Sequence, residues 1–270
     1  MNIVSSLRIV KLSGMKKSIS IIGLLLFIVM IYFNYLSGIG AINNISAGDV
    51  SNKYPTLFTP AGFTFSIWGI IYLFGFLFVI RLLWVASRKN SITEVNQLSL
   101  YYSLSCIINT FWLFSWHYDI LWLSELLMLS LLLILILLYQ KISKSNIQST
   151  GVFLVTSAPI SIYLGWITVA TVANTSVWLT SMGWFGQPFP ESFWAGTMVI
   201  IAAAISFMVL VKKRDYFFGM VYLWAAYGIM IARINDPVQG SIWIVRIILV
   251  GMILVFIGIL YARFVRVRKV

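Results

Sequence analysis

The stretch LLMLSLLLILILL, from Leu126 to Leu138, contains no charged residue and one polar residue, Ser130. In lipid, an isolated strand would leave its backbone N–H and C=O groups unpaired, whereas a helix pairs them internally. The stretch therefore predicts a membrane-spanning helix. Lys141 and Lys144 follow closely and indicate where this span leaves the membrane.

Seven further apolar segments accompany this one along the chain. A hydrocarbon core of about 30 Å requires roughly 20 apolar residues per helix, and a 270-residue chain that is 61% hydrophobic, with a mean hydropathy of +0.97, has room for eight. We expect an all-α integral membrane protein with eight transmembrane helices, located in the cell membrane, which is the cytoplasmic membrane if the host is bacterial. The predicted segments are 21–37, 62–86, 97–116, 120–139, 152–178, 193–211, 216–233 and 241–262.

Basic residues lie on alternate connections between these segments. If each segment spans once, 16 of the 19 basic residues share one side of the membrane, and short loops rich in Lys and Arg stay cytoplasmic. Both termini are therefore predicted to be cytoplasmic. The net charge of +12 is spread in twos to fours over these loops, which suits anionic lipid headgroups and argues against nucleic acid as a partner. The 16 residues are Arg8, Lys11, Lys16, Lys17, Arg81, Arg88, Lys89, Lys141, Lys144, Lys212, Lys213, Arg214, Arg263, Arg266, Arg268 and Lys269.

The first predicted outer connection, residues 38–61, is long and rich in Gly, Asn and Ser, with Pro55 and Pro60. Such a composition breaks helices and favours turns, and a loop of this length in a compact protein is usually functional or mobile. We interpret it as a lid over an outward-facing cavity. The alternative is a solvated connector.

Within the fifth predicted span, Trp166, Ala170, Asn174 and Trp178 recur every four residues, which places them along one stripe of the helix. An unpaired amide costs a few kcal/mol in hydrocarbon. Asn174 is therefore expected to meet a neighbouring helix or a cavity.

Two other spans repeat this combination of rings and amides. Trp68 and Tyr72 lie four residues apart in the second span, and Asn109 and Trp112 lie about one turn apart in the third. The three spans together predict one pocket lined by aromatic rings and amides. The alternative is that these aromatic residues only pack the helices together.

The remaining polar and aromatic residues fit simpler interpretations. Glu125 and Arg246 each lie about one turn inside a predicted span, and we expect an ion pair that links the last three helices to the core; the alternative is a contact to the charged group of a ligand.

His117 is a lone histidine in a short outer turn, so no hydrolytic set can be assembled around it. Tryptophans at outer helix ends are expected to form an interfacial belt; they are Trp116, Trp122, Trp178, Trp184, Trp194 and Trp243.

Four stretches of the chain resemble the translocator protein, or tryptophan-rich sensory protein (TspO/MBR), family. The resemblance covers a five-helix core at about 18–180 and leaves three additional membrane helices within 181–270. Where the family has paired prolines and an aromatic residue in the first loop, this chain has Pro60, Ala61, Gly62 and Phe63. The four stretches are PAGFTFSIWGIIY (60–72), NTFW (109–112), WLSE (122–125) and GWITVATVANTSVW (165–178).

The resemblance implies a pocket inside the bundle, closed by the first loop, for a planar apolar ligand such as a porphyrin, including haem, or a sterol-like lipid. It implies that the protein either binds this ligand or also transports it. A protein of this kind is expected to require no cofactor and to be surrounded by membrane lipid. Whether it forms a homodimer is left open. Some relatives degrade protoporphyrin in light, which leaves an enzymatic activity undecided. The predicted ligand-binding residues, from the resemblance and the pattern of rings and amides together, are Phe63, Trp68, Tyr72, Asn109, Trp112, Trp166, Ala170 and Asn174.

Two other functions remain open at this point. A secondary transporter would use all eight helices, but the halves show no inverted repeat, although Pro159 interrupts the fifth span. A membrane sensor would act through a protein partner that docks on the basic inner loops.

Overall fold

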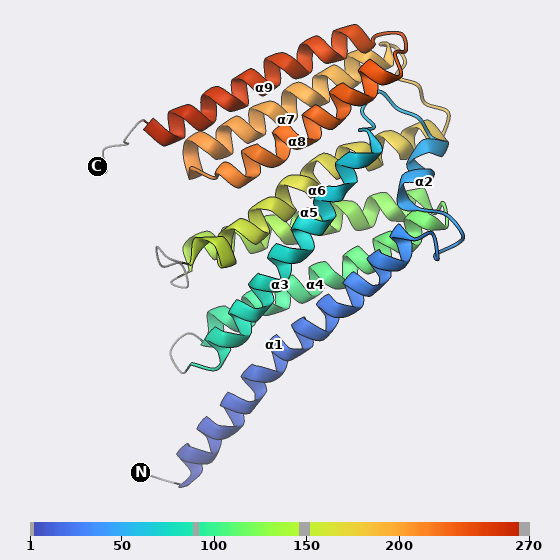
Figure 1. Cartoon of the computed structure of the whole chain (residues 1–270). Helices are drawn as coiled ribbons and strands as arrows, with labels where there is room; N and C mark the ends of the chain where they lie inside the picture. The colour runs from blue at the N-terminus through green and yellow to red at the C-terminus, as the bar shows by residue number, and fades with distance from the viewer. Residues whose placement is uncertain (1–2, 89–91, 146–151, 265–270) are drawn as a thin grey trace.

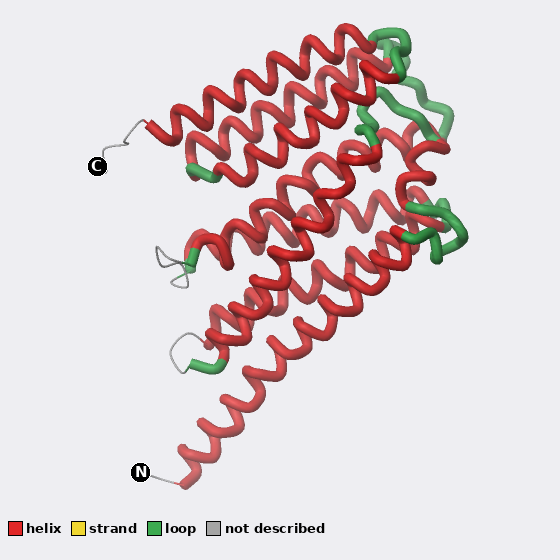
Figure 2. The backbone as a smooth tube through the Cα atoms, viewed as in Figure 1, coloured by secondary structure: helices red, strands yellow, loops and turns green. Residues whose placement is uncertain are grey.

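A computed structural model describes residues 3–88, 92–145 and 152–264, and in these ranges all regular secondary structure is helical, with no strand (Figures 1 and 2). Eight long helices are joined by short connections, and one short helix and one 3₁₀ helix lie in the first long connection. The elements are α1 (Ile3–Gly38), α2 (Ala47–Lys53), η1 (Gly62–Ser66), α3 (Ile67–Ala86), α4 (Ile92–His117), α5 (Leu121–Lys144), α6 (Phe153–Ser181), α7 (Glu191–Lys213), α8 (Tyr216–Asn235) and α9 (Ser241–Phe264).

A long helix occupies each of the eight predicted segments, so the all-α prediction is confirmed. Seven of these helices are long and apolar enough to cross a membrane. The exception is α4, which has sufficient length but carries many hydroxyl and amide side chains. Several of them, including Ser99, Ser103, Ser105 and Asn109, are buried. The lower hydropathy of α4 therefore reflects its position between other helices.

Five helices form a closed ring in the order α1, α4, α5, α6 and α3, and α3 returns to α1. Each neighbouring pair in this order is in contact, so the interior of the ring is shielded on every side. We call the end of the bundle that carries α2 the lid end. The start of α1 and the end of α9 both lie at the opposite end (Figure 1).

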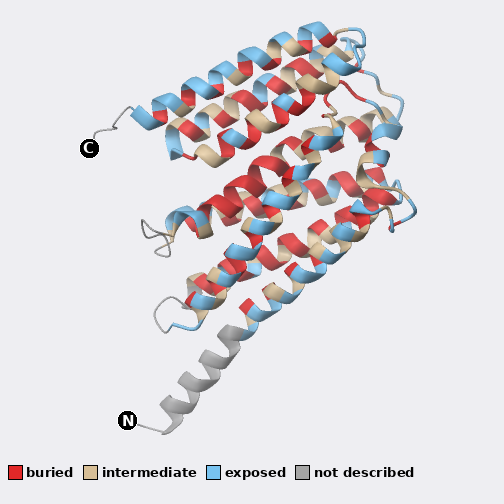
Figure 3. Cartoon of the chain, viewed as in Figure 1, coloured by how far each residue is buried: buried red, intermediate tan, exposed pale blue. Residues whose placement is uncertain are grey.

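The last three helices, α7, α8 and α9, contact one another and attach to the ring mainly through α8 and α6. Small residues allow this close packing, since they let helix backbones approach; Gly196 faces Ile247, and Gly251 faces Tyr222 and Ala203. Because α6 touches α3, α5 and α8, it is the most deeply buried of the candidate spans (Figure 3). The surface of α9 away from these contacts exposes large apolar side chains, as expected for a helix in lipid.

At the end of the bundle opposite the lid, Asp215 joins the three-helix unit to the ring. It caps α8 by accepting a hydrogen bond from the backbone N–H of Phe218. Its carboxylate also accepts hydrogen bonds from Tyr139 Oη of α5 at 2.7 Å and from Ser161 Oγ of α6 at 2.6 Å. Full pairing lets this carboxylate remain buried without leaving an acceptor unsatisfied.

The prediction of an ion pair between Glu125 and Arg246 is wrong. Arg246 is exposed on α9, with its guanidinium 5.4 Å from the centroid of the Trp243 ring, whereas Glu125 is buried and bonded to Asn174 and Thr175 of α6. The reason is the packing order, since α9 packs on α7 and α8, while α5 packs on α4 and α6.

Candidate functional site

A small cavity lies inside the ring beneath the first long connection, and we call it the aromatic pocket. Its volume is about 60 Å³. It combines residues of α3, α4, α5 and α6 with four residues from the first long connection above them. The lining residues are Ala47, Ser51, Pro60, Phe65, Trp68, Trp112, Trp116, Met128, Trp166, Val169, Ala170, Ala173, Asn174 and Val177.

Four rings of α3 and α4 form a continuous stack along one side of the aromatic pocket. Tyr72 stacks on Trp68 at 5.7 Å between ring centroids, Trp68 on Trp112 at 6.3 Å, and Trp112 on Trp116 at 6.1 Å. The stack forms because Trp68 and Tyr72, like Trp112 and Trp116, lie one turn apart on their helices. Offset stacking of this kind adds about 0.5–1.5 kcal/mol per pair beyond the area that the rings bury.

Trp166 of α6 meets this stack from the other side of the pocket. Its ring lies edge-on to Trp68, with centroids 6.3 Å apart and an angle of 83° between the planes, and Phe65 packs against it at 6.0 Å. Trp166 is 2% exposed, and its indole N–H has no hydrogen-bond partner. A buried donor without a partner is unusual, and this one belongs to a residue of the pocket wall.

Asn174 ties three helices of the ring together. Its Oδ1 accepts hydrogen bonds from Trp112 Nε1 of α4 at 3.0 Å and from Ser124 Oγ of α5 at 2.8 Å. Its Nδ2 donates to Glu125 Oε2 of α5 at 2.8 Å. The expectation that this amide meets neighbouring helices is confirmed, and the same bonds hold the Trp112 ring at the pocket.

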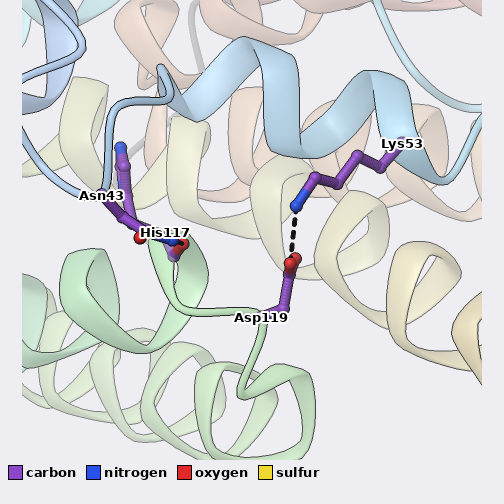
Figure 4. A network of polar contacts seen from close by, with 4 residues as sticks. All are labelled: Asn43, Lys53, His117 and Asp119. Atoms are coloured by element: carbon purple, nitrogen blue, oxygen red, sulfur yellow. Dashed lines mark hydrogen bonds and ion pairs between the residues drawn. The ribbon is translucent and has the colours of Figure 1, made fainter.

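The short helix α2 covers the pocket and is fastened to the end of α4 and to the turn that follows it. Trp116 Nε1 donates a hydrogen bond to the carbonyl of Ala47 at 3.0 Å, and Lys53 Nζ forms an ion pair with Asp119 Oδ2 at 2.6 Å (Figure 4). The hydrogen bond to Asp119 raises the pKa of the Lys53 ammonium group. At the start of α2, Ser46 and Asp49 form a capping box, in which hydrogen bonds from the side chain and backbone of Ser46 lower the pKa of the Asp49 carboxyl.

The histidine belongs to this fastening. Asn43 Nδ2 donates to the carbonyl of His117 at 2.7 Å (Figure 4). His117 Nδ1 lies 2.8 Å from the carbonyl of Leu113, which can only accept, so Nδ1 carries a proton. In the neutral ring Nε2 then accepts from Ser37 Oγ at 2.9 Å. His117 is buried with both nitrogens bonded, and within the described ranges no group of three or more His, Cys, Asp or Glu residues could hold a metal.

The second half of the long connection is held by α7 and α8. Glu191 Oε1 accepts a hydrogen bond from the backbone N–H of Leu57 at 2.6 Å, and the N–H of Ala61 donates to the carbonyl of Gly228 at 3.0 Å. A Cβ atom at position 228 would collide with Thr64, so the contact between η1 and α8 requires glycine there. The additional helices therefore anchor the loop that covers the aromatic pocket.

The structure brings together five of the eight predicted ligand-binding residues, Trp68, Trp112, Trp166, Ala170 and Asn174, at the wall of one cavity. Tyr72 and Asn109 are not part of this wall. Tyr72 stacks on Trp68, which is, and Asn109 Oδ1 accepts a hydrogen bond from Asn34 Nδ2 of α1 at 2.9 Å. Phe63 is 43% exposed and packs on Trp224 and Tyr227 of α8. Their roles in binding stay predictions.

The sequence interpretation missed Trp116, which it placed in the interfacial belt. Trp116 is 6% exposed and completes the stack beneath α2, whereas Trp122 and Trp243 are 60% and 64% exposed, as belt residues are. Its position four residues after Trp112 was the available signal. Phe65, Met128, Val169, Ala173 and Val177 also line the pocket, and no sequence signal separates them from ordinary core residues.

The arrangement defines a multi-pass helical membrane protein with an aromatic pocket under a fastened loop. A family model described as TSPO-like protein matches residues 20–261. This chain therefore belongs to the TSPO-like protein family. The match confirms the suspected family and extends over α7, α8 and α9, beyond the five-helix resemblance. No curated protein and no solved structure is similar enough to this chain to count as a match.

The ion pair between Lys53 and Asp119 provides a test of how α2 is fastened. We expect Lys53→Gln to increase amide hydrogen exchange in residues 47–53 by up to about fivefold, since a partly exposed ion pair contributes at most about 1 kcal/mol. Exchange is measured by mass spectrometry of the purified protein. Lys53→Arg keeps the charge and serves as the control; equal exchange in both variants would show that the pair does not hold α2.

Asn174 provides a test of the three-helix junction. We expect Asn174→Ala to lower the thermal unfolding midpoint far more than Ser124→Ala, because it leaves both the Trp112 N–H and the buried Glu125 carboxylate without this partner. The expected costs are on the order of 3 kcal/mol for Asn174→Ala and about 1 kcal/mol for Ser124→Ala. A fall no larger than that of Ser124→Ala would contradict the central role of the amide.

Proposed function

We propose that this TSPO-like membrane protein binds a planar apolar molecule, such as a porphyrin or other tetrapyrrole, or a sterol-like lipid, in the aromatic pocket. The observation that carries this proposal is the convergence of Trp68, Trp112 and Trp166 on one lidded cavity. Flat apolar ligands gain buried area and stacking against such rings. The unpartnered Trp166 N–H offers a hydrogen bond to a carbonyl or carboxylate of the ligand.

Ligand entry requires the pocket to open. The cavity of about 60 Å³ is well below the roughly 300–1,000 Å³ of sites that enclose drug-sized ligands. The fastening of α2 consists of one ion pair and a few hydrogen bonds, which can be exchanged for bonds to water. We infer that α2 lifts from α4, while the half of the loop bonded to α7 and α8 stays in place.

Binding is favoured over carriage across the membrane by the packing below the pocket. Towards the end opposite the lid, the interior of the ring is filled by fully buried side chains, including Phe78, Leu131, Leu135 and Ile160. A carrier would need a path through this part of the ring, whereas a protein that binds and releases its ligand on one side does not. Protoporphyrin uptake by proteoliposomes would instead favour the carrier.

The binding proposal is tested by titrating the purified protein with protoporphyrin and following both the Soret absorbance and tryptophan fluorescence. We expect saturable binding that is at least tenfold weaker in Trp68→Phe, Trp166→Phe, because these changes remove stacking area and the free indole N–H. A matched control is Trp122→Phe, Trp243→Phe, which changes two exposed indoles. Binding that does not saturate, or that weakens equally in both double variants, would reject the proposal.

We also propose that all eight long helices cross the membrane and that both termini are cytoplasmic. Support comes from seven apolar spans, from the buried polar residues of α4, and from the start of α1 and the end of α9 lying at the same end of the bundle. In a Cys106→Ala background, we expect Asp119→Cys to react with an impermeant maleimide in intact cells and Arg88→Cys to react only after permeabilisation. The same behaviour at both positions would show that α4 does not cross.

A further inference from the structure

A second and larger cavity lies between α6 and α7, outside the ring, and we call it the side cavity. Its volume is about 330 Å³, which is within the range of small-molecule sites. It shares no lining residue with the aromatic pocket. Four aromatic residues, Phe58, Trp184, Phe185 and Trp194, and one acid, Glu191, belong to its wall.

The side cavity exists because α6 and α7, although consecutive, hardly touch. α7 packs on α9 and α8, while α6 packs on α5, α3 and α8. The connection between them carries two of the aromatic rings and is held in place by indole hydrogen bonds. Trp194 Nε1 donates to the carbonyl of Gly186 at 2.7 Å, and Trp184 Nε1 donates to the carbonyl of Gln187 at 3.2 Å. The rings are therefore held in position without a ligand.

Three of the four hydroxyl residues on the α6 side of the side cavity have their hydrogen-bond donors occupied. Thr171 and Ser176 donate hydrogen bonds to carbonyls of their own helix, four residues earlier. Thr175 Oγ1 lies 2.7 Å from Glu125 Oε1 and 2.8 Å from the carbonyl of Thr171. These donors are occupied, so this wall presents mainly carbon atoms and hydroxyl oxygens.

Glu191 is the only charged residue among those that line the side cavity, and no Lys, Arg or His is among them. Oε1 of its carboxylate accepts the hydrogen bond from Leu57. Arg233 is near enough to interact electrostatically with Glu191 and with Asp236, but it is not part of the wall. Glu191 is therefore the one charge that a ligand in the side cavity contacts directly.

We propose that the side cavity binds a lipophilic cation, with its apolar body among the aromatic rings and its positive charge facing Glu191. Aromatic faces attract cations by about 0.5–2 kcal/mol each, depending on desolvation, and the single carboxylate adds a charge of the opposite sign. An anion of the same shape is repelled by the aromatic faces and by the carboxylate. The site is distinct from the aromatic pocket and independent of the function proposed for it.

The probes that test this inference are tetraphenylphosphonium and tetraphenylborate, which have the same shape and opposite charge. Equilibrium dialysis against the purified full-length protein, run separately for each radiolabelled ion because the two form an insoluble salt together, is expected to show saturable binding of tetraphenylphosphonium and none of tetraphenylborate. Glu191→Gln should weaken binding at least tenfold. The glutamine keeps an acceptor for the Leu57 N–H, so the loop and the fold are retained.

Two control variants separate the side cavity from other sites. Asp236→Asn removes an exposed carboxylate outside the wall and should change affinity by less than twofold, and Trp68→Phe, Trp166→Phe should leave tetraphenylphosphonium binding unchanged even if porphyrin binding is lost. Absence of saturable binding would overturn the proposal. Equally tight binding of tetraphenylborate would also overturn it, because it would indicate an apolar site without charge selection. Undiminished tetraphenylphosphonium binding in Glu191→Gln would overturn it as well.

Discussion

The amide of Asn174 is the interaction on which the rest of the ring depends. In a membrane the hydrophobic effect does not hold helices to one another, so packing and hydrogen bonds must supply the association. One side chain of α6 here binds α4 through Trp112 and α5 through Ser124 and Glu125. This junction sets the distance between the three helices and orients the Trp112 ring. The stack of Trp68, Trp112 and Trp116 is positioned as a consequence.

The same junction lies between two cavities of different chemistry. Asn174 is part of the wall of the aromatic pocket, and the next residue, Thr175, is part of the wall of the side cavity; both are bonded to the Glu125 carboxylate. The aromatic pocket is small and lined by indoles, with no charged residue in its wall. The side cavity is larger and has a carboxylate in its wall. Stacking suits the first and charge selection suits the second.

Two of the three C-terminal helices support the cavities. α8 anchors the loop above the aromatic pocket through Gly228, and α7 supplies Glu191 and Trp194 to the side cavity. Their contribution to the fold is correspondingly local, since they reach the ring mainly through α6. The family match over residues 20–261 agrees with this arrangement, because it includes these helices with the ring.

The sequence by itself determined the helical segments, since only helices satisfy backbone groups in lipid, and it identified the family through the motifs around Trp68 and Trp166. It also indicated that Asn174 must be paired, because an isolated amide is too costly in hydrocarbon. Only the tertiary structure decided that Trp116 is buried, that Glu125 bonds α6 and not Arg246, and that a cavity separates α6 from α7. The physical reason is that periodicity shows which face of a helix is distinctive, while the identity of the neighbouring helix follows from the order in which the ring closes.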